Sequence, residues 1–284
     1  MEIHGVVILY NPDETIIKNI NSYINSLKKI YVVDNSEEKD ISLICRIKEI
    51  SDKCEYINSH GNKGIAHALN VGAKFAIENG ADWLLTMDQD SSFVQGSLIK
   101  LIEWIENNAS SNVGIIAPCH DINNNNIEDD KTIIHVDTVM TSGSLLNIKA
   151  YQKVGGFLDE LFIDYVDNEY CLRLKINNYR ILQLNNSVLK HSLGNIESFT
   201  LFNKTIYYTN HSHIRRYYIA RNSLYVCNIY KKQFKDYYKK EQKRNIINII
   251  KIIFLEKNKI KKIRFVLKGI IHFYKNQFGK LKND

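Results

Sequence analysis

The chain has 284 residues, of which 44% are apolar and 11% aromatic. A chain of this length and composition can bury a substantial core, which excludes an intrinsically disordered protein. The net charge of +7 is unevenly distributed, because residues 231–284 hold 17 Lys and Arg against 4 Asp and Glu and carry +13, while residues 1–230 carry −6. The basic character therefore belongs to the tail alone.

No feature of the sequence directs the chain out of the cell. No Lys or Arg precedes the first short apolar stretch, so no secretory signal is expected. No run approaches the roughly 18 apolar residues of a spanning helix. The five cysteines form no CxxC pair, and their odd number favours reduced thiols. We expect an intracellular protein.

The first ninety residues alternate between predicted strands and helices. Apolar runs that end in turn residues indicate strands, and apolar side chains three or four residues apart indicate helices. The predicted strands cover residues 3–9, 30–33, 55–57 and 83–87, and the predicted helices cover 15–27, 41–50 and the stretch between Gly64 and Gly80. This alternation predicts a mostly parallel sheet with helices on both faces.

Polar clusters follow three of these strands. They are Tyr10-Asn11-Pro12, Asp34-Asn35-Ser36 and Asp88-Gln89-Asp90. In open sheets of this type ligands bind at the carboxyl ends of the strands, so we expect the clusters to converge on one crevice. One such cluster alone is ordinary turn chemistry, since Asn, Asp, Ser and Pro are the residues that turns use.

Asp88 and Asp90 are two residues apart at the end of a predicted buried strand. Residues i and i+2 of an extended segment point the same way, so the two carboxylates repel each other unless a cation lies between them. A hard divalent cation such as Mg2+ prefers oxygen ligands and keeps positions for water and substrate phosphates. The alternative is that solvated aspartates cap the next helix.

The order of motifs resembles that of the family 2 inverting glycosyltransferases, especially bacterial rhamnosyltransferases. The motifs are "VVILYNP", "IYVVDNS", "GNKGIAHALNVG", "LLTMDQDSSF", "TSGSLLNIKAYQKVGGFLDELFIDYVDNEYCLRL" and "VLKHSLG". Each piece is generic by itself, but six in this order carry the resemblance, which extends over about residues 3–225.

The resemblance implies an α/β GT-A fold, a nucleotide-sugar-binding fold with a Rossmann-like mixed sheet flanked by helices, over residues 1–225. It also implies a Mg2+ or Mn2+ cofactor, with Asp90 and His191 as metal ligands. A lone His is more often a hydrogen-bonded structural residue. The residues that match the family's donor nucleotide pocket are Tyr10, Asn11, Pro12, Asp34, Asn62, Gly64 and Asp88.

The family's general base falls on Asp167. The residue before it is Val166, where the family commonly has an acidic side chain, and this departure leaves Asp164 and Glu169 as alternatives. Glu169 and Arg173 are four residues apart, which favours a helical ion pair. Asp164 and Asp167 also resemble the acidic start of a helix, which is the structural alternative for Asp167.

Three further residues are candidate acceptor or phosphate contacts. Gly143 resembles part of the family's acceptor-side segment and would give room for a sugar ring, although a simple strand bend also uses glycine. Glu169 follows the predicted base, and Arg221 belongs to a stretch similar to the rhamnosyltransferase pattern "YYxxRN". An arginine fork suits phosphate.

The tail, residues 226–284, mixes Lys with apolar clusters and is predicted to be helical. A basic helix with one apolar side favours contact with an anionic membrane surface. The alternatives are a helical subdomain packed on the catalytic domain and a dimer contact. Nucleic-acid binding, the other use of a basic helix, is disfavoured by the acidic remainder of the chain.

These observations predict a glycosyltransferase that moves L-rhamnose from dTDP-rhamnose onto a glycan or lipid-linked glycan acceptor. The product would be an intermediate of a cell-surface polysaccharide, such as O-antigen or capsule. The expected location is cytoplasmic, peripheral at the inner face of the cell membrane. The alternatives are the same fold with a UDP-hexose or UDP-galactofuranose donor, and a non-catalytic sugar-nucleotide-binding scaffold.

Overall fold

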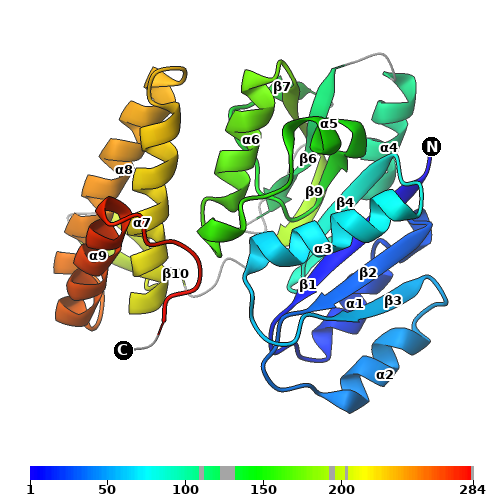
Figure 1. Cartoon of the computed structure of the whole chain (residues 1–284), viewed down its shortest axis with the longest axis horizontal. Coiled ribbons are helices and arrows are strands. Elements are labelled where there is room, and N and C mark those ends of the chain that lie inside the picture. The colour runs from blue at the N-terminus through cyan, green and yellow to red at the C-terminus, as the bar shows by residue number, and fades with distance from the viewer. Residues whose placement is uncertain (109–111, 122–131, 192–195, 202–203, 283–284) are drawn as a thin grey trace. The chain divides into compact units, whose positions relative to one another are not determined.

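The computed structural model describes residues 1–284 except 109–111, 122–131, 192–195, 202–203 and 283–284 (Figure 1). The chain divides into two compact units. The first, here called the sheet unit, comprises Met1–Asp159 and Asp167–Ser192. The second, here called the helical unit, comprises Glu160–Val166 and Leu193–Asp284.

The sheet unit is built on a mixed nine-stranded sheet. Its first half is parallel, as the sequence predicts, with β3 (Cys54–Asn58), β2 (Lys29–Asp34), β1 (Ile3–Leu9) and β4 (Trp83–Asp88) side by side. The second half is mixed: β8 (Ser144–Asn147) runs antiparallel to β4 and to β6 (Val113–Asp121), and β6 runs parallel to β9 (Arg180–His191). Two short strands, β5 (Ser91–Phe93) and β7 (Ile133–His135), pair antiparallel with β9.

Helices cover both faces of the parallel half. Alternate residues of β1 point to opposite faces, and all seven are buried. Ile3, Val7 and Leu9 belong to the core that also contains apolar side chains of α1 (Thr15–Asn21), α2 (Ile41–Glu49) and α4 (Ser97–Asn107). Val6 points to the other face, where α3 (Ile65–Glu78) packs so closely that only glycine fits at position 72. The prediction of helices on both faces is confirmed.

Two predicted element bounds differ from the structure. The helix expected over residues 15–27 ends at Asn21, and a 3₁₀ turn, η1 (Ile24–Ser26), completes the connection to β2. The helix expected to start near Asp164 is α6, which begins at Val166, because Asp164 and Tyr165 adopt left-handed φ values of 63° and 65° that no α-helix accepts. The remaining helical segments of this region are α5 (Ile148–Val154) and the 3₁₀ turn η2 (Asp159–Leu161).

The helical unit contains three long helices that contact one another (Figure 1). They are α7 (His213–Tyr230), α8 (Lys235–Phe254) and α9 (Lys259–Tyr274), preceded by a hairpin of β10 (Ile196–Leu201) and β11 (Lys204–Thr209). The boundary predicted between residues 225 and 226 falls inside α7, which packs with the tail helices and therefore belongs to their unit. Among the described residues, none of the helices is long and apolar enough to span a bilayer.

The contact between α7 and α9 depends on Gly269. A Cβ atom placed there would lie 2.5 Å from the backbone oxygen of Tyr217 and 3.3 Å from the Cβ of Ala220. A backbone oxygen inside a helix cannot move aside easily, so the missing side chain allows the two helices to approach.

We expect Gly269→Ala to lower the free energy of unfolding by about 1–3 kcal/mol, the usual cost of overpacking. The measurement is chemical denaturation followed by circular dichroism. In an exposed helix the same change stabilises by about 0.5–1 kcal/mol through helix propensity. A gain in stability would therefore contradict the close approach of α7 and α9.

Candidate active site

The parallel strands end at the same edge of the sheet. The strand register places Leu9 opposite Asp34, Asp34 opposite Asn58 and Ile8 opposite Asp88. One predicted polar cluster follows Leu9, and the other two begin at the last residues of β2 and β4. The clusters therefore lie along one edge of the sheet, where open α/β sheets bind their ligands.

Hydrogen bonds join these clusters into one rim. The Asn11 N–H donates to Ser36 Oγ (2.8 Å), which links the loops after β1 and β2. The Asn35 side chain donates to the Gly64 carbonyl (3.0 Å), which links the loop after β2 to the start of α3. The convergence of the strand ends, expected from their sequence positions, is confirmed.

Gln89 is the middle residue of the segment Asp88-Gln89-Asp90, called the D-x-D below. It joins this third cluster to the rim. Its Oε1 accepts from the Tyr10 N–H (2.7 Å), and its Nε2 donates to the Tyr10 carbonyl (3.2 Å). The Asn19 side chain of α1 also donates to the Gln89 carbonyl (2.8 Å). Sequence reasoning missed this residue, although an amide between two aspartates is suited to pair with a backbone N–H and C=O together.

Asp34 is buried and already has partners. One carboxylate oxygen accepts from the Ser36 N–H (2.8 Å) and lies 3.3 Å from Lys39 Nζ, while the other accepts from the Tyr56 hydroxyl (2.8 Å). Burial and this hydrogen bond raise the pKa of Tyr56, so its hydroxyl keeps its proton. These contacts fix the strand end in the way that turn chemistry requires.

Asn35 has an acceptor atom without a donor. Its side chain is 2% exposed, and in the described part of the chain nothing donates to its Oδ1. Buried polar atoms are nearly always paired with protein, water or ligand. The side-chain oxygen of Asn35, Oδ1, is therefore an atom of the rim whose environment indicates a bound donor group.

The other predicted pocket residues lie on the same rim. Asn62 Oδ1 accepts from the Gly64 N–H (3.0 Å), and Gly64 has a φ of 95°, a left-handed value that glycine permits. Tyr10 is 47% exposed, Asn11 is exposed and Pro12 is half-buried. Lys63, between Asn62 and Gly64, points to solvent.

The Ser142 hydroxyl forms hydrogen bonds that hold the D-x-D segment in place. Its Oγ accepts from the Asp88 N–H (3.1 Å) and donates to Ser91 Oγ (2.8 Å). Asp88 is half-buried and Asp90 is exposed. The backbone of His191, at the end of β9, pairs with Ser91, but the His191 side chain falls outside what the structure describes. The described residues include no group of three or more His, Cys, Asp or Glu arranged as a metal site.

The backbone conformation and the close neighbours of residue 143 require a glycine at this position. Its φ is 81°, and a Cβ there would lie 2.9 Å from Pro118 and from Leu189. Its N–H donates to the Thr86 carbonyl (2.8 Å), which continues the pairing of β4 and β8. Of the two readings of this glycine, the structure supports the strand bend.

Asp167 lines a small cavity beside β4. Thr86 of β4, Thr141, Ser144 of β8 and Cys171 share this cavity of about 10 Å³. Burial raises the pKa of Cys171 to about 12 and also raises that of Tyr170, another lining residue, so both keep their protons at neutral pH. Asp167 is the one carboxylate among the lining residues, and it lies on the first turn of α6, across this cavity from Thr86 of the strand that carries Asp88.

Glu169 and Asp164 are engaged elsewhere. Glu169 is 1% exposed, and both of its oxygens accept from Arg173 (2.9 and 2.8 Å), which confirms the predicted helical ion pair. Arg173 also donates to the carbonyls of Val154 and Gly156. The Glu169 carboxylate is thus buried against Arg173, and its contact with acceptor or phosphate stays a prediction. Asp164, in the helical unit, pairs with Arg215 (3.1 Å), which opposes the rise that burial causes in its pKa.

Arg221 and Asn222 hold the segment Glu160–Val166 from α7. Arg221 is fully buried, donates to the carbonyls of Gly279, Glu160 and Leu161, and stacks its guanidinium near Tyr217, Tyr218 and Phe278. Asn222 Nδ2 donates to the carbonyls of Leu161 (2.8 Å), Ile163 (2.8 Å) and Asp164 (3.0 Å). In this structure the Arg221 guanidinium donates to backbone carbonyls, and the phosphate contact stays a prediction.

The comparison with solved structures identifies the fold. GalNAc-T7, crystallised with UDP, GalNAc and Mn2+, is similar with a TM-score of 0.64 at 12% identity. The superposition covers 84% of this chain and 49% of that one, so the chain spans about half of that protein's length. The fold, with polar clusters at the carboxyl ends of its parallel strands, is that of the GT-A glycosyltransferases.

The model of the family described as glycosyl transferase family 2 matches residues 6–208, and the chain belongs to this family. It is 30% identical over 240 residues to the dTDP-rhamnosyl transferase RfbF of Shigella flexneri, which covers 78% of each chain. It is 23% identical over 203 residues to the low-salt glycan biosynthesis hexosyltransferase Agl10 of Haloferax volcanii, with 63% of this chain and 64% of that one covered. The expected fold and family are confirmed, and the chain is a glycosyltransferase.

We expect Asn222→Leu to lower the free energy of unfolding by about 2 kcal/mol or more. The change removes one amide that serves three carbonyls, and buried carbonyls left without a donor each cost about 1–3 kcal/mol. The measurement is urea denaturation. Asn228→Leu, at an exposed position of the same helix, is the matched control and should change stability by less than about 0.5 kcal/mol. Equal effects of the two changes would contradict the role of Asn222.

Proposed function

We propose that this family 2 glycosyltransferase moves L-rhamnose from dTDP-rhamnose onto a glycan or lipid-linked glycan acceptor of a cell-surface polysaccharide, with inversion at the anomeric carbon. The structural observation that carries the proposal is the rim, in which hydrogen bonds join the loops after β1, β2 and β4. The similarity to a dTDP-rhamnosyl transferase over 78% of the chain supports the choice of donor.

The rim has the groups that a pyrimidine nucleoside needs. Thymine has one N–H, and ribose-type sugars have hydroxyl donors, so the site must offer acceptors. Asn35 Oδ1 lacks a donor in the described chain, and the Asp34 oxygens have further lone pairs beside the bonds they already accept. Tyr10, exposed at the end of β1, offers an aromatic face to the base. Asn62 and Gly64 complete this side of the pocket.

Asp90 would hold a divalent cation, Mg2+ or Mn2+, while Asp88 would contact the donor nucleotide. Asp90 fits such an ion because it is an exposed carboxylate just after the end of β4, and the neighbouring Asp88 N–H is held by the Ser142 hydroxyl. His191 ends the strand next to Ser91 and is the other predicted ligand. When bound, the ion would supply charge stabilisation for the diphosphate leaving group.

Asp167 is the proposed general base. It would accept the proton of the acceptor hydroxyl while that oxygen attacks the anomeric carbon from the side opposite the leaving diphosphate. One displacement of this kind inverts the centre. Asp167 holds the position that matches the family's general base, and it lines the cavity beside β4 together with Thr86, which supports this assignment.

A UDP-hexose donor is the second candidate. The similarity to the Haloferax hexosyltransferase favours it, and the Asn35 and Asp34 acceptors serve uracil as well as thymine because both bases have the same N–H. The donor base alone does not separate the two sugars.

The helical unit is the proposed membrane contact. On α8 the side chains of Ile250, Ile253 and Phe254 are 48%, 45% and 71% exposed, and lysines surround them. Exposed apolar side chains beside basic residues are typical of helices that lie in a bilayer interface. A peripheral position at an anionic membrane would bring the enzyme to a lipid-linked acceptor.

The experiment that tests the donor is a thermal-shift screen with dTDP, UDP and GDP, each with and without Mg2+ or Mn2+. A metal-dependent shift with dTDP alone is expected. A preference for UDP would replace the donor and keep the mechanism. No shift with any of the three would indicate a protein that does not use these nucleotides.

We expect Asp90→Ala to abolish the metal-dependent part of dTDP binding and to leave the unfolding temperature of the free protein unchanged, because Asp90 is exposed. Isothermal titration of dTDP with and without Mg2+ measures the effect. Asp236→Ala, an exposed carboxylate on α8, is the control and should bind as the wild type does. The metal role fails if Mg2+ has the same effect on the Asp90→Ala variant as on the wild type.

We expect Asp167→Asn to keep donor affinity and to lower kcat by about 10²-fold or more, the contribution of a positioned base. The measurement combines sugar transfer under saturating donor with dTDP titration. The variant Glu169→Gln separates the structural role of Glu169 from the catalytic role of Asp167. It is expected to lose stability, because breaking a buried ion pair costs about 3–5 kcal/mol. Near-normal turnover of Asp167→Asn would assign the base to another residue.

A further inference from the structure

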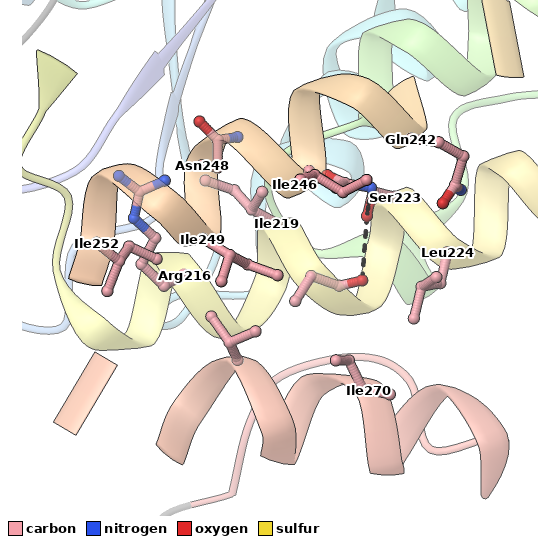
Figure 2. Close-up of a pocket in the computed structure, with 13 residues that line it drawn as sticks. Arg216, Ile219, Ser223, Leu224, Gln242, Ile246, Asn248, Ile249, Ile252 and Ile270 are labelled. Carbon is pink, nitrogen blue, oxygen red and sulfur yellow. Dashed lines mark hydrogen bonds between the residues drawn. The ribbon is translucent and has the colours of Figure 1, made fainter. Parts of the chain in front are cut away.

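The helical unit has a half-open, mostly apolar pocket of about 200 Å³ among its helices (Figure 2). Side chains of three helices line it, and the residues that give it its character are Ile219 of α7, Ile246, Ile249 and Ile252 of α8, and Val266 and Ile270 of α9. Pockets with mostly aliphatic walls stay dry when empty and accept hydrocarbon ligands.

The lining is mostly apolar, although it includes polar side chains. Ser223 Oγ, for example, accepts from the Asn245 side chain (3.2 Å) and donates to the Ala220 carbonyl (3.1 Å). Because this serine already has a polar partner, it does not require a polar ligand. The occupant that fits this part of the pocket is therefore a chain of methylene groups.

One lining residue carries an unused donor. Arg216 is 3% exposed, and its Nη2 donates to the Thr209 carbonyl (2.8 Å) and pairs with Glu256. Its Nε–H has no acceptor in the described part of the chain. An ester or phosphate oxygen would supply one, which favours an amphiphile over a plain hydrocarbon.

The pocket wall continues into an exposed apolar surface. Ile246 and Ile249 line the pocket and are also 59% and 37% exposed. Ile250, Ile253 and Phe254 extend this surface along α8. A contiguous apolar surface of this kind usually marks an interaction site.

The surroundings of that surface are basic. Lys239, Lys240 and Lys243 of α8 and Lys259 and Lys261 of α9 are exposed. Each basic residue near an anionic membrane contributes about 1 kcal/mol to binding. The charge of the unit complements anionic lipid headgroups, and its apolar surface complements their chains.

We propose that the pocket among α7, α8 and α9 takes one acyl chain of an anionic membrane phospholipid. The lipid headgroup lies among the lysines, and the chain passes Ile246 and Ile249 into the pocket. The proposal rests on the membrane contact proposed above and adds a defined lipid site to it. It is independent of the donor and of the catalytic residues.

The experiment uses the full-length protein with vesicles of phosphatidylcholine, with or without phosphatidylglycerol. A trace of phosphatidylglycerol with a photoactivatable diazirine in its acyl chain labels the residues that the chain touches, and mass spectrometry of the digest locates the label. We expect label on Ile246–Ile252 and on Val266–Ile270 with the anionic vesicles, and at least five-fold less with phosphatidylcholine alone.

Two variants of α7 make the test specific. Ile219→Trp fills the pocket and should reduce labelling of the pocket at least five-fold while sedimentation with anionic vesicles persists. Ile229→Trp, at a position that is 41% exposed and outside the pocket, should label as the wild type does. Circular dichroism and the dTDP thermal shift show that each variant is folded.

Three results would overturn the proposal. Label confined to Ile250, Ile253 and Phe254 and insensitive to Ile219→Trp would indicate surface contact without a chain in the pocket. A concentration-dependent dimer that protects α8 from label would make a second copy of the chain the occupant. Absence of vesicle binding would remove the lipid, and a preserved shift with dTDP would show that the proposed transferase function stands nevertheless.

Discussion

The rim of the sheet depends on one physical requirement, that the polar backbone groups at the strand ends find partners. At β1 the next residue in the chain does not supply them. The N–H and C=O of Tyr10 pair with the Gln89 side chain, and the N–H of Asn11 pairs with Ser36. Each loop is thus held by a side chain from another loop. The bonds that satisfy the backbone also hold the loops that carry Asp34, Asn35 and Asp88 along one edge of the sheet, so the geometry of the rim follows from the packing of its supports.

The same reasoning assigns the acidic residues around α6. A buried carboxylate is stable only with a partner, and an arginine fork is the strongest available. Asp164 and Glu169 have such partners in Arg215 and Arg173. Arg173 also donates to the carbonyls of Val154 and Gly156. The Glu169–Arg173 pair therefore fixes the chain before α6 as well as the helix itself. Asp167, the proposed general base, lies on the first turn of α6 and lines the cavity beside β4.

The sequence predicts the parallel half of the sheet well, because apolar periodicity and turn residues decide it locally. The strand ends, the D-x-D and the Glu169–Arg173 pair could be predicted for the same reason. The contacts of Arg221 could not be predicted, because the sequence does not distinguish an arginine that donates to backbone carbonyls from one that binds phosphate. The need for glycine at 143 depends on a neighbour distant in the chain, Leu189. Gln89 was missed because its partner is 79 residues away.

The basic charge of the helical unit is not all of one kind. Arg216 and Lys262 lie buried on the two oxygens of Glu256, so their charge is used inside the unit and holds α7, the end of α8 and α9 together. The lysines that a partner meets are those on the surface of α8 and α9. A nucleic acid would neutralise these lysines but would leave Ile250, Ile253 and Phe254 in water, where they cost free energy. A lipid surface covers both the charges and the apolar side chains, and for this reason the physical chemistry of the unit favours membrane over nucleic acid.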